Sequence, residues 1–202
     1  MLNQITKLEK LINSELSSKV LKSFIKNNEL MIEIDDNDLV EVIQFLKANE
    51  QCKFKQLIDI AGVDYPDEEK RFKLIYLFLS HEHNHRIKLS IQLEARQVIN
   101  SITKIFPSAN WMEREVFDMY GIKFKNHPDL RRILTDYGFE GHPLRKDFPL
   151  TGHSEVRYSE EKKKVINEPV KLEQNYRNFD YESPWEGTKY IKEISEINDK
   201  KN

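Results

Sequence analysis

Apolar residues recur at helical spacing in two stretches of the N-terminal part of the chain. In residues 5–24 they fall every three or four positions, which predicts one amphipathic helix, with Thr6 and Glu9 as a capping box at its start. Residues 39–46 show the same spacing, and Asp38 stands where an N-cap residue is expected. Each predicted helix therefore has one apolar face to bury.

Four shorter segments show the patterns of β-strands. They span residues 30–34, 57–61, 71–80 and 86–93. Residues 71–80 are almost continuously apolar, which is typical of a strand at the centre of a sheet, and residues 86–93 alternate, which is typical of a strand with one buried face. Helical spacing returns in residues 95–106, up to Pro107, and a further helix is predicted near residues 111–120.

The order of these elements predicts an α+β fold, a small mixed β-sheet with packed helices. We expect the core domain to cover residues 1–124. Beyond residue 125 the periodicity is lost, and five of the seven prolines and four of the six glycines fall there. Aromatic residues remain scattered through a segment too irregular to build a core of its own. Residues 125–202 are therefore expected to hold a signature segment and a long irregular C-terminal arm that docks on another protein.

Composition and charge exclude several classes of function. The chain has 202 residues and a net charge of -2, which does not suit a general nucleic-acid binder. It has no run of roughly 20 apolar residues, the length of a membrane-spanning helix. Its single cysteine, Cys52, excludes an internal disulfide and an iron–sulfur cluster held by this chain alone. Without a glycine-rich phosphate loop, no dinucleotide or ATP site is predicted.

His81, His83 and His85 alternate along the chain between two predicted strands. On one extended strand their imidazoles would share a face and could hold zinc or nickel, so a free-standing metal-dependent enzyme is an alternative of another class. Their place between two strands favours instead a hairpin turn with Asn84 at its tip. No carboxylate or cysteine stands at a supporting position, and we expect no metal site.

Three acidic side chains lie on the helix predicted near residues 111–120. Glu113 and Glu115 would point about 200° apart, so they cannot form an acid–base pair. Arg114 and Asp118 have the four-residue spacing of a helical ion pair. We therefore expect a polar helix end that pairs with cationic neighbours, and no catalytic residue.

Two basic pairs lie among turn-forming residues, Arg131 with Arg132 and Arg145 with Lys146. Prolines around them stiffen the backbone, which lowers the entropy lost on docking, and arginine can grip a carboxylate with two hydrogen bonds. We expect a protein interface in which Arg145 pairs with acidic groups of a partner and Phe148 packs as an apolar anchor.

Three ordered runs carry a resemblance to a known family. They are residues 113–120 (EREVFDMY), 127–134 (HPDLRRIL) and 137–149 (YGFEGHPLRKDFP). Together with residues 62–66 (GVDYP) and 168–186, they closely resemble the C subunit of the proton-pumping NADH:quinone oxidoreductase, respiratory complex I. The similarity covers nearly the whole chain.

The resemblance implies a non-catalytic structural and assembly subunit of the peripheral arm. The complex passes electrons from NADH through FMN and iron–sulfur clusters to quinone, and couples this transfer to proton translocation. The FMN and the clusters lie in partner subunits, and this chain holds no cofactor. Its partners would chiefly be the quinone-site large subunit and the subunit with the terminal iron–sulfur cluster.

The resemblance also implies a location and leaves one alternative open. The chain would lie on the cytoplasmic side of a bacterial inner membrane, or on the matrix side of the mitochondrial inner membrane if an organelle encodes it. The absence of a signal or transit peptide pattern favours the bacterial case. The equivalent subunit of a membrane-bound nickel–iron hydrogenase or formate hydrogenlyase is the alternative within the resemblance.

The residues that match the family motif are expected to form the interface with partner subunits. None is expected to be catalytic or to bind a metal or cofactor. They are Glu113, Arg114, Glu115, Asp118, His127, Arg131, Arg132, His142, Pro143, Arg145, Lys146, Asp147, Phe148 and Pro149.

Overall fold

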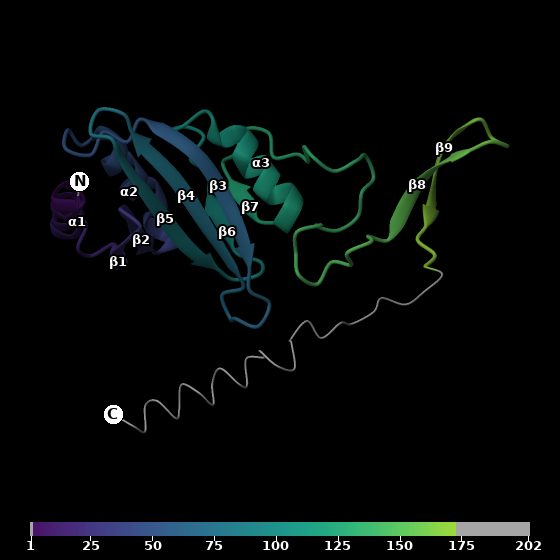
Figure 1. Cartoon of the computed structure of the whole chain (residues 1–202), viewed down its shortest axis with the longest axis horizontal. Coiled ribbons are helices and arrows are strands. Elements are labelled where there is room, and N and C mark those ends of the chain that lie inside the picture. The colour runs from purple at the N-terminus through teal and green to yellow at the C-terminus, as the bar shows by residue number, and fades with distance from the viewer. Residues whose placement is uncertain (1, 173–202) are drawn as a thin grey trace, which may run out of the picture. The chain divides into compact units, whose positions relative to one another are not determined.

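The computed structural model describes residues 2–172, which fall into two compact units divided after Gly152. The first unit is built on a five-stranded sheet in the order β1-β2-β5-β4-β3 (Figure 1). Within this sheet β2 and β5 run parallel and the other neighbours run antiparallel, so the predicted small mixed sheet of an α+β fold is confirmed. The strands are β1 (Val20–Lys26), β2 (Glu29–Ile34), β3 (Gln56–Asp64), β4 (Phe72–Ser80) and β5 (His85–Leu93).

The first helix ends earlier than predicted. α1 covers Leu2–Glu15, and β1 occupies the end of the stretch that was expected to be helical. Asn27 and Asn28 have φ of 53° and 60°, the left-handed geometry of a two-residue turn, and they join β1 to β2 as a hairpin. Pairing with β2 thus overrides the helical spacing in β1. Thr6 and Glu9 lie inside α1, so the capping box at its start was wrong.

The second helix, α2 (Leu39–Ala48), forms where it was predicted. Asp38 precedes it as expected, but its side chain makes no capping hydrogen bond. The capping side chain belongs instead to Asp35, which accepts a hydrogen bond from the N–H of Asn37 at 3.2 Å at the start of a short 3-10 helix, η1 (Asp36–Asp38).

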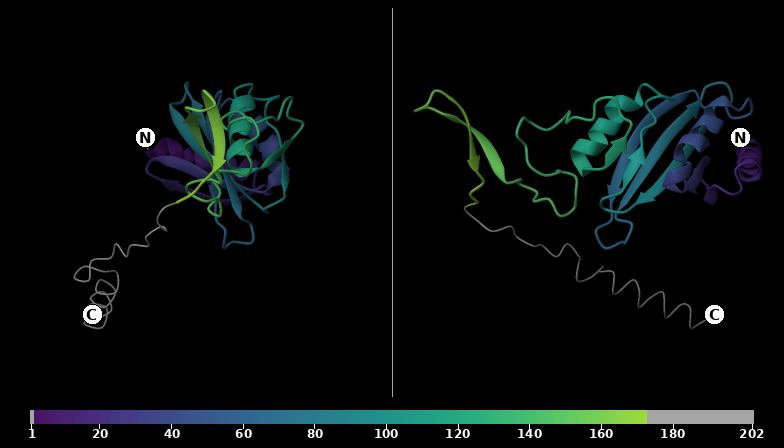
Figure 2. Two further views of the ribbon diagram at one scale, coloured as in Figure 1. Left: turned by 90° about the vertical axis from the view of Figure 1, so that its right-hand side faces the viewer. Right: turned by 180° about the vertical axis from the view of Figure 1, so that it is seen from behind.

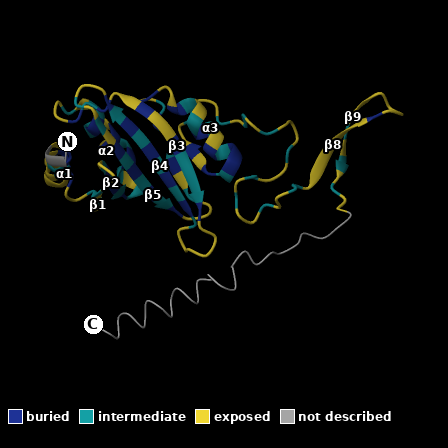
Figure 3. Cartoon of the chain, in the orientation of Figure 1, coloured by how far each residue is buried: buried dark blue, intermediate teal, exposed yellow. Residues whose placement is uncertain are grey.

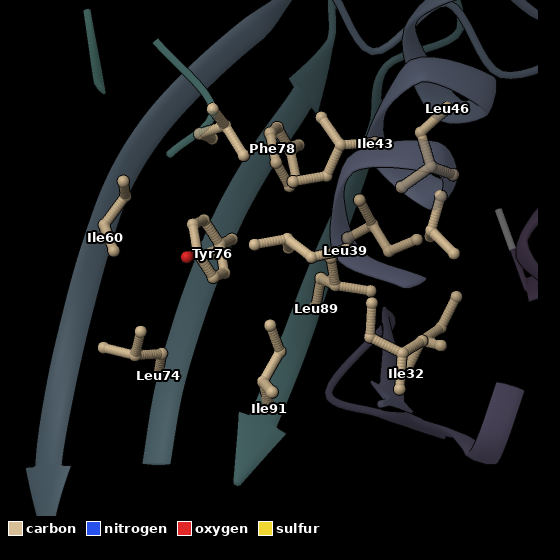
Figure 4. Packing of buried hydrophobic residues seen from close by; sticks show 14 of the residues in the cluster. Ile32, Leu39, Ile43, Leu46, Ile60, Leu74, Tyr76, Phe78, Leu89 and Ile91 are labelled. Carbon is tan, nitrogen blue, oxygen red and sulfur yellow. The ribbon is translucent and has the colours of Figure 1, made fainter. Parts of the chain in front are cut away.

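The hydrophobic core lies between the sheet and the helices. Along β4, fully buried residues alternate with half-buried ones, so one face of the sheet is turned inward. Figure 4 shows α2 over this face, with Leu39, Ile43 and Leu46 pointing toward the buried side chains of the strands. α3 packs along β3, and α1 lies at the end of the sheet away from α3 (Figures 1 and 2).

Residues 95–106 do not form the predicted helix. β6 (Val98–Asn100) instead pairs in parallel with β7 (Lys123–Lys125), and the N–H of Ser101 extends the pairing to the carbonyl of Lys125 at 2.9 Å. A partner strand more than twenty residues away therefore outweighs a weak local helical pattern. The next helix, α3 (Ala109–Tyr120), confirms the helix predicted near residues 111–120.

In the second unit, the residues up to 172 contain one antiparallel hairpin, β8 (Ser154–Ser159) and β9 (Lys164–Pro169), whose residues are mostly exposed (Figure 3). The division after Gly152 groups residues 125–152 with the sheet, whereas the sequence predicted a boundary at residue 124. Docking of the C-terminal arm stays a prediction, and its part beyond residue 172 lies outside the described residues. Across residues 2–172, no helix combines the length and apolar character that a membrane crossing requires.

Candidate functional site

The signature residues meet around α3, where the carboxylate of Asp118 holds the loop of residues 132–135. Its side chain is fully buried and accepts five hydrogen bonds. The donors are the N–H groups of Ile133 (3.0 Å), Leu134 (2.8 Å) and Thr135 (2.9 Å), the hydroxyl of Thr135 (2.6 Å) and Nη1 of Arg132 (3.2 Å). Burial alone would raise the pKa of Asp118, but these hydrogen bonds outweigh it and lower the pKa to about 2.

Arg114 holds the same loop through its carbonyl groups. Its Nε donates to the carbonyl of Arg131 at 3.0 Å, and its Nη2 donates to the carbonyl of Arg132 at 3.1 Å. Arg114 and Asp118 therefore do not form the predicted ion pair with each other. One supplies donors and the other supplies acceptors to a loop that has no regular secondary structure to satisfy its backbone groups.

Residues 142–145 close the C-terminal end of α3. The helix ends at Gly121, whose φ of 77° is the left-handed conformation favoured after a helix. The last carbonyl groups of a helix have no partner inside it. Three donors of this segment reach three successive carbonyls: Nδ1 of His142 to Asp118 at 2.9 Å, N of Leu144 to Met119 at 3.1 Å, and Nε of Arg145 to Tyr120 at 2.6 Å.

A second buried carboxylate, Asp64 at the end of β3, fixes the next part of the signature. Arg71 donates to it twice, at 2.6 and 2.8 Å, and the backbone N–H of Lys146 donates to it at 2.7 Å. Nη1 of Arg71 also lies 2.9 Å from Oδ2 of Asp147. The hydrogen bonds from Arg71 outweigh the effect of burial and lower the pKa of Asp64. Asp147 is thus paired within the chain.

Aromatic contacts hold the remainder of residues 137–149 together. The rings of Phe139 and Phe148 lie 5.8 Å apart, and the guanidinium of Arg132 lies 5.8 Å from the Phe139 ring. Gly141 has φ of 92°, and a side chain there would run into the Phe148 ring. Phe148 therefore packs against its own chain, and its predicted role as an anchor on a partner stays a prediction.

Glu113 lies on the buried side of α3. One carboxylate oxygen accepts a hydrogen bond from the N–H of Ile102 at 2.8 Å, and the other has no hydrogen-bond partner. The nearest cationic candidate is His127, whose Nε2 is 3.9 Å from that second oxygen. However, Nε2 contacts the carbonyl of Asn110 at 3.0 Å while Nδ1 accepts from the N–H of Asp129 at 3.1 Å. These two bonds assign the neutral Nε2–H tautomer, so Glu113 and His127 are not an ion pair.

The remaining signature residues are more accessible. Arg131 is exposed and pairs with Asp129 at 2.8 Å, and Glu115, on the opposite side of α3 from Glu113, is exposed as well. The side chains of Lys146 and Pro149 are exposed and Pro143 is half-buried. Most charged signature residues therefore make hydrogen bonds or ion pairs within this chain. These contacts do not test the predicted interface with partner subunits, which stays a prediction.

The three histidines of the alternative metal site lie in the predicted hairpin turn. β4 ends at Ser80, β5 begins at His85, and Asn84 has φ of 51°, so the turn is confirmed. His81 contacts Gln56 at 2.6 Å and His83 contacts the carbonyl of Glu50 at 3.0 Å. Among the described residues, no group of three or more His, Cys, Asp or Glu side chains is placed to hold a metal ion.

Cys52 is buried, and burial raises the pKa of its thiol to about 11. A thiol with such a pKa is protonated at neutral pH, whereas a metal ligand or nucleophile must be the thiolate. Cys52 is therefore a core residue.

Sequence reasoning missed the pair formed by Asp64 and Arg71. Both lie at the loop end of the β3–β4 hairpin, where Asp64 stands opposite Phe72. The available signal was an acidic residue closing one apolar strand and a basic residue opening the next, a pattern that places opposite charges side by side in an antiparallel hairpin.

Comparison with known proteins agrees with the resemblance. The profile of the family described as respiratory-chain NADH dehydrogenase, 30 Kd subunit, matches residues 32–154. The C subunit of the NADH-quinone oxidoreductase of Mesorhizobium japonicum is 50% identical over 93% of this chain and 93% of its own length. The protein of the same name from Hyphomonas neptunium is 56% identical over 79% of each chain.

A solved structure shares the fold. A chain of the membrane-bound sulfane sulfur reductase, an archaeal respiratory membrane complex, superposes with a TM-score of 0.63 and 21% sequence identity. The alignment covers 85% of this chain and 98% of that chain. At this identity the likeness concerns the fold alone, whereas the sequence matches identify the family. The chain belongs to the 30 kDa subunit family of the respiratory-chain NADH dehydrogenase, the family that includes the C subunits of bacterial NADH-quinone oxidoreductases.

Proposed function

We propose that this chain is a non-catalytic structural and assembly subunit in the peripheral arm of respiratory complex I. Membership of the family makes it a subunit of an NADH:quinone oxidoreductase complex. The proposal adds that its partners are chiefly the quinone-site large subunit and the terminal iron–sulfur subunit. It also adds that FMN and the clusters lie in partner subunits, and that the chain lies on the cytoplasmic side of a bacterial inner membrane.

The observation that carries the proposal is the amphipathic β8–β9 hairpin. Val156, Tyr158 and Val165 are 61%, 52% and 63% exposed, and the register places Tyr158 opposite Val165 on one face. The other face is mostly polar, with Ile166 as its apolar residue among those described, and holds an ion pair between Arg157 and Glu168 at 2.7 Å. A two-stranded hairpin alone in water is at best marginally stable, and clustered exposed apolar side chains mark a docking surface.

The state of the signature carboxylates supports a non-catalytic role. Asp118 and Asp64 are both buried, hydrogen-bonded and held in the ionised form, so neither is available to exchange a proton with a substrate. With one buried cysteine in the sequence, the chain also lacks the thiolates that an iron–sulfur cluster needs.

The test uses the full chain with an affinity tag, expressed in cells that lack the untagged copy. Replacing the apolar face with Tyr158→Ser and Val165→Ser should sharply lower the recovery of partner subunits. The matched control is Glu155→Ser and Lys164→Ser, which changes the polar face of the same hairpin. We expect control complexes to retain the normal set of partner proteins and normal NADH:quinone turnover per complex.

Two outcomes would contradict the proposal. Equal recovery of partners with both double variants would mean that the apolar face does not dock. Normal assembly with abolished turnover in the Tyr158→Ser, Val165→Ser variant would place the hairpin near the quinone chemistry. The recovered partners also decide the alternative, because a hydrogenase would bring a nickel–iron subunit and no FMN-bearing NADH-oxidising subunit.

A further inference from the structure

A basic pocket in the first unit lies beside the C-terminal end of α3, where His142 and Arg145 bind the last carbonyl groups of the helix. It encloses about 470 Å³ between the segment that follows β5, strand β7 and the C-terminal end of α3. Its lining includes Arg96, Val98, Gly121, Lys123, His142 and Arg145, and none of its lining residues is acidic. The pocket therefore collects positive charge from three separate segments of the chain.

The two surface cations of the pocket are free. Within the described part of the chain, neither Arg96 nor Lys123 makes an ion pair or a side-chain hydrogen bond, and both residues are exposed. Two other exposed arginines do have partners, since Arg131 pairs with Asp129 and Arg157 pairs with Glu168. Arg96 and Lys123 thus keep their charges available.

The third cation, Arg145, is partly buried and lacks a carboxylate partner. Its Nε donates to the carbonyl of Tyr120 at 2.6 Å, and its guanidinium lies 5.4 Å from the centre of the Phe72 ring. Two carboxylates act on it only from a distance, because Arg71 already binds both Asp64 and Asp147. Among the described residues, Arg145 makes no ion pair.

This arrangement leaves the charge of Arg145 incompletely compensated. Burial, and then the neighbouring charge of Arg71, lowers the pKa of Arg145. An anion that entered the pocket would offset this cost and could use the guanidinium nitrogens that face no acceptor.

The shape of the pocket also depends on Gly121, which has no side chain. Any Cβ at Gly121 would collide with the side chains of Arg145 and His142. Val98, 49% exposed, adds an apolar surface to the lining. A mixture of cations and apolar surface suits a peptide segment better than a bare inorganic anion, which would use the charges alone.

We propose that the pocket formed by Arg96, Lys123 and Arg145 binds an acidic segment of a partner protein, one that supplies at least two carboxylates. The inference rests on the proposed function, because the segment comes from another subunit of the assembled complex. The occupant is identified by charge complementarity, since three unpaired cations surround a cavity without an acidic residue.

The first experiment reverses the two free charges in the full-length tagged chain. Cells carrying Arg96→Glu with Lys123→Glu are compared with cells carrying Arg86→Glu with Lys104→Glu. The second pair is exposed, unpaired within the described residues, outside the pocket and equal in its change of net charge. After a wash at moderate salt, we expect partner recovery to fall about tenfold for the pocket pair and to stay at the wild-type level for the control.

A milder variant guards against misfolding. Arg96→Ala with Lys123→Ala removes two side chains that make no bond, so its thermal unfolding should match that of the wild type. Recovery should still fall severalfold, and the loss should grow as salt rises, because charge pairing is screened. If the Arg96→Ala, Lys123→Ala variant folds normally and recovers as much partner protein as the wild type at every salt concentration, the inference is overturned.

A second experiment identifies the occupant. A benzoylphenylalanine photocrosslinker replaces Val98 in the full chain, and the complex is illuminated, digested and analysed by mass spectrometry. We expect crosslinks to a partner segment with two or more Asp or Glu residues close together. Crosslinks to a segment without carboxylates, to lipid, or to nothing in an assembled complex would overturn the pocket inference alone. Failure of the tagged wild-type chain to recover any other protein of complex I would instead overturn the proposed function.

Discussion

Glu113 is a carboxyl group whose protonation is controlled by the fold. Burial raises its pKa to about 7, against the opposing effect of hydrogen bonds from Ile102 and Ser101. Its second oxygen has no partner, and neither has the buried hydroxyl of Tyr76, whose pKa is raised by burial and then by the charge of Glu113. At neutral pH the ionised form of Glu113 is therefore costly in the folded state.

This gives a prediction with a definite sign. Between pH 4.5, the ordinary pKa of a glutamate, and about pH 7, the folded state binds a proton that the unfolded state has lost. Protonated Glu113 makes its whole contribution to the free energy of unfolding below pH 4.5, and this contribution is lost as the pH rises through 7. Relative to wild type, Glu113→Gln should gain about 3 kcal/mol in free energy of unfolding between pH 4.5 and 8.

Urea unfolding at several pH values measures this difference. The control is Glu115→Gln, which changes an exposed carboxyl on the same helix and should follow the wild type within about 0.5 kcal/mol. A Glu113→Gln curve parallel to that of the wild type across the whole range would show that the carboxyl titrates normally.

Asp118 shifts stability in the opposite direction. Its lowered pKa means that its contribution is present above pH 3.8 and is lost as the pH falls toward 2. Asp118→Ala would leave Arg132 and three backbone N–H groups of the partly buried loop without their shared acceptor, so we expect a loss of about 3–5 kcal/mol at pH 7. Asp129→Ala, at an exposed ion pair, should cost less than about 1 kcal/mol. Thermal unfolding of both variants measures the contrast, and equal losses would contradict the central role of Asp118.

At the scale of elements, the packing of α3 on β3 depends on Gly62. A Cβ at this position would lie 2.7 Å from the ring of Tyr120, too close for any real contact. Gly62→Ala should therefore push α3 from the strand and cost about 1–3 kcal/mol.

The matched control is Gly138→Ala. Gly138 has φ of 77°, and nothing lies within 4 Å of its added Cβ, so this variant carries only the backbone strain of about 1 kcal/mol. Denaturant unfolding compares the two. If Gly138→Ala lowers the free energy of unfolding more than Gly62→Ala does, the close approach of α3 to β3 does not explain why position 62 is a glycine.

At the scale of the whole molecule, the two units should differ in their resistance to proteolysis. The β8–β9 turn at residues 160–163 is exposed, carries lysines and belongs to a hairpin without a core. Brief trypsin treatment of the free chain should therefore cut beyond Gly152 before it cuts the five-stranded sheet.

Mass spectrometry of the first fragments checks this order. The assembled complex serves as the comparison, because docking of the hairpin should protect the turn. First fragments that end inside the sheet, or equal protection of the turn in the free chain and in the complex, would contradict the expected docking arm.

Much of the fold could be predicted from the sequence because its strongest signals are local. The apolar run of β4 and the alternation of β5 depend on burial alone, and the histidine turn follows from its place between them. The motif runs around α3 likewise indicate the family, because they depend on residue identity and order alone. These features need no knowledge of a distant partner.

The tertiary structure decided what depends on residues far apart in the chain. β1 and β6 are strands because β2 and β7 pair with them, against a local helical pattern. Arg114 and Asp118 have helical ion-pair spacing, yet each binds the loop of residues 131–135, whose backbone groups must find partners once they leave water. Likewise, the pocket around Arg145 exists because three segments that are separate in the sequence meet there, a juxtaposition that no spacing along the chain encodes.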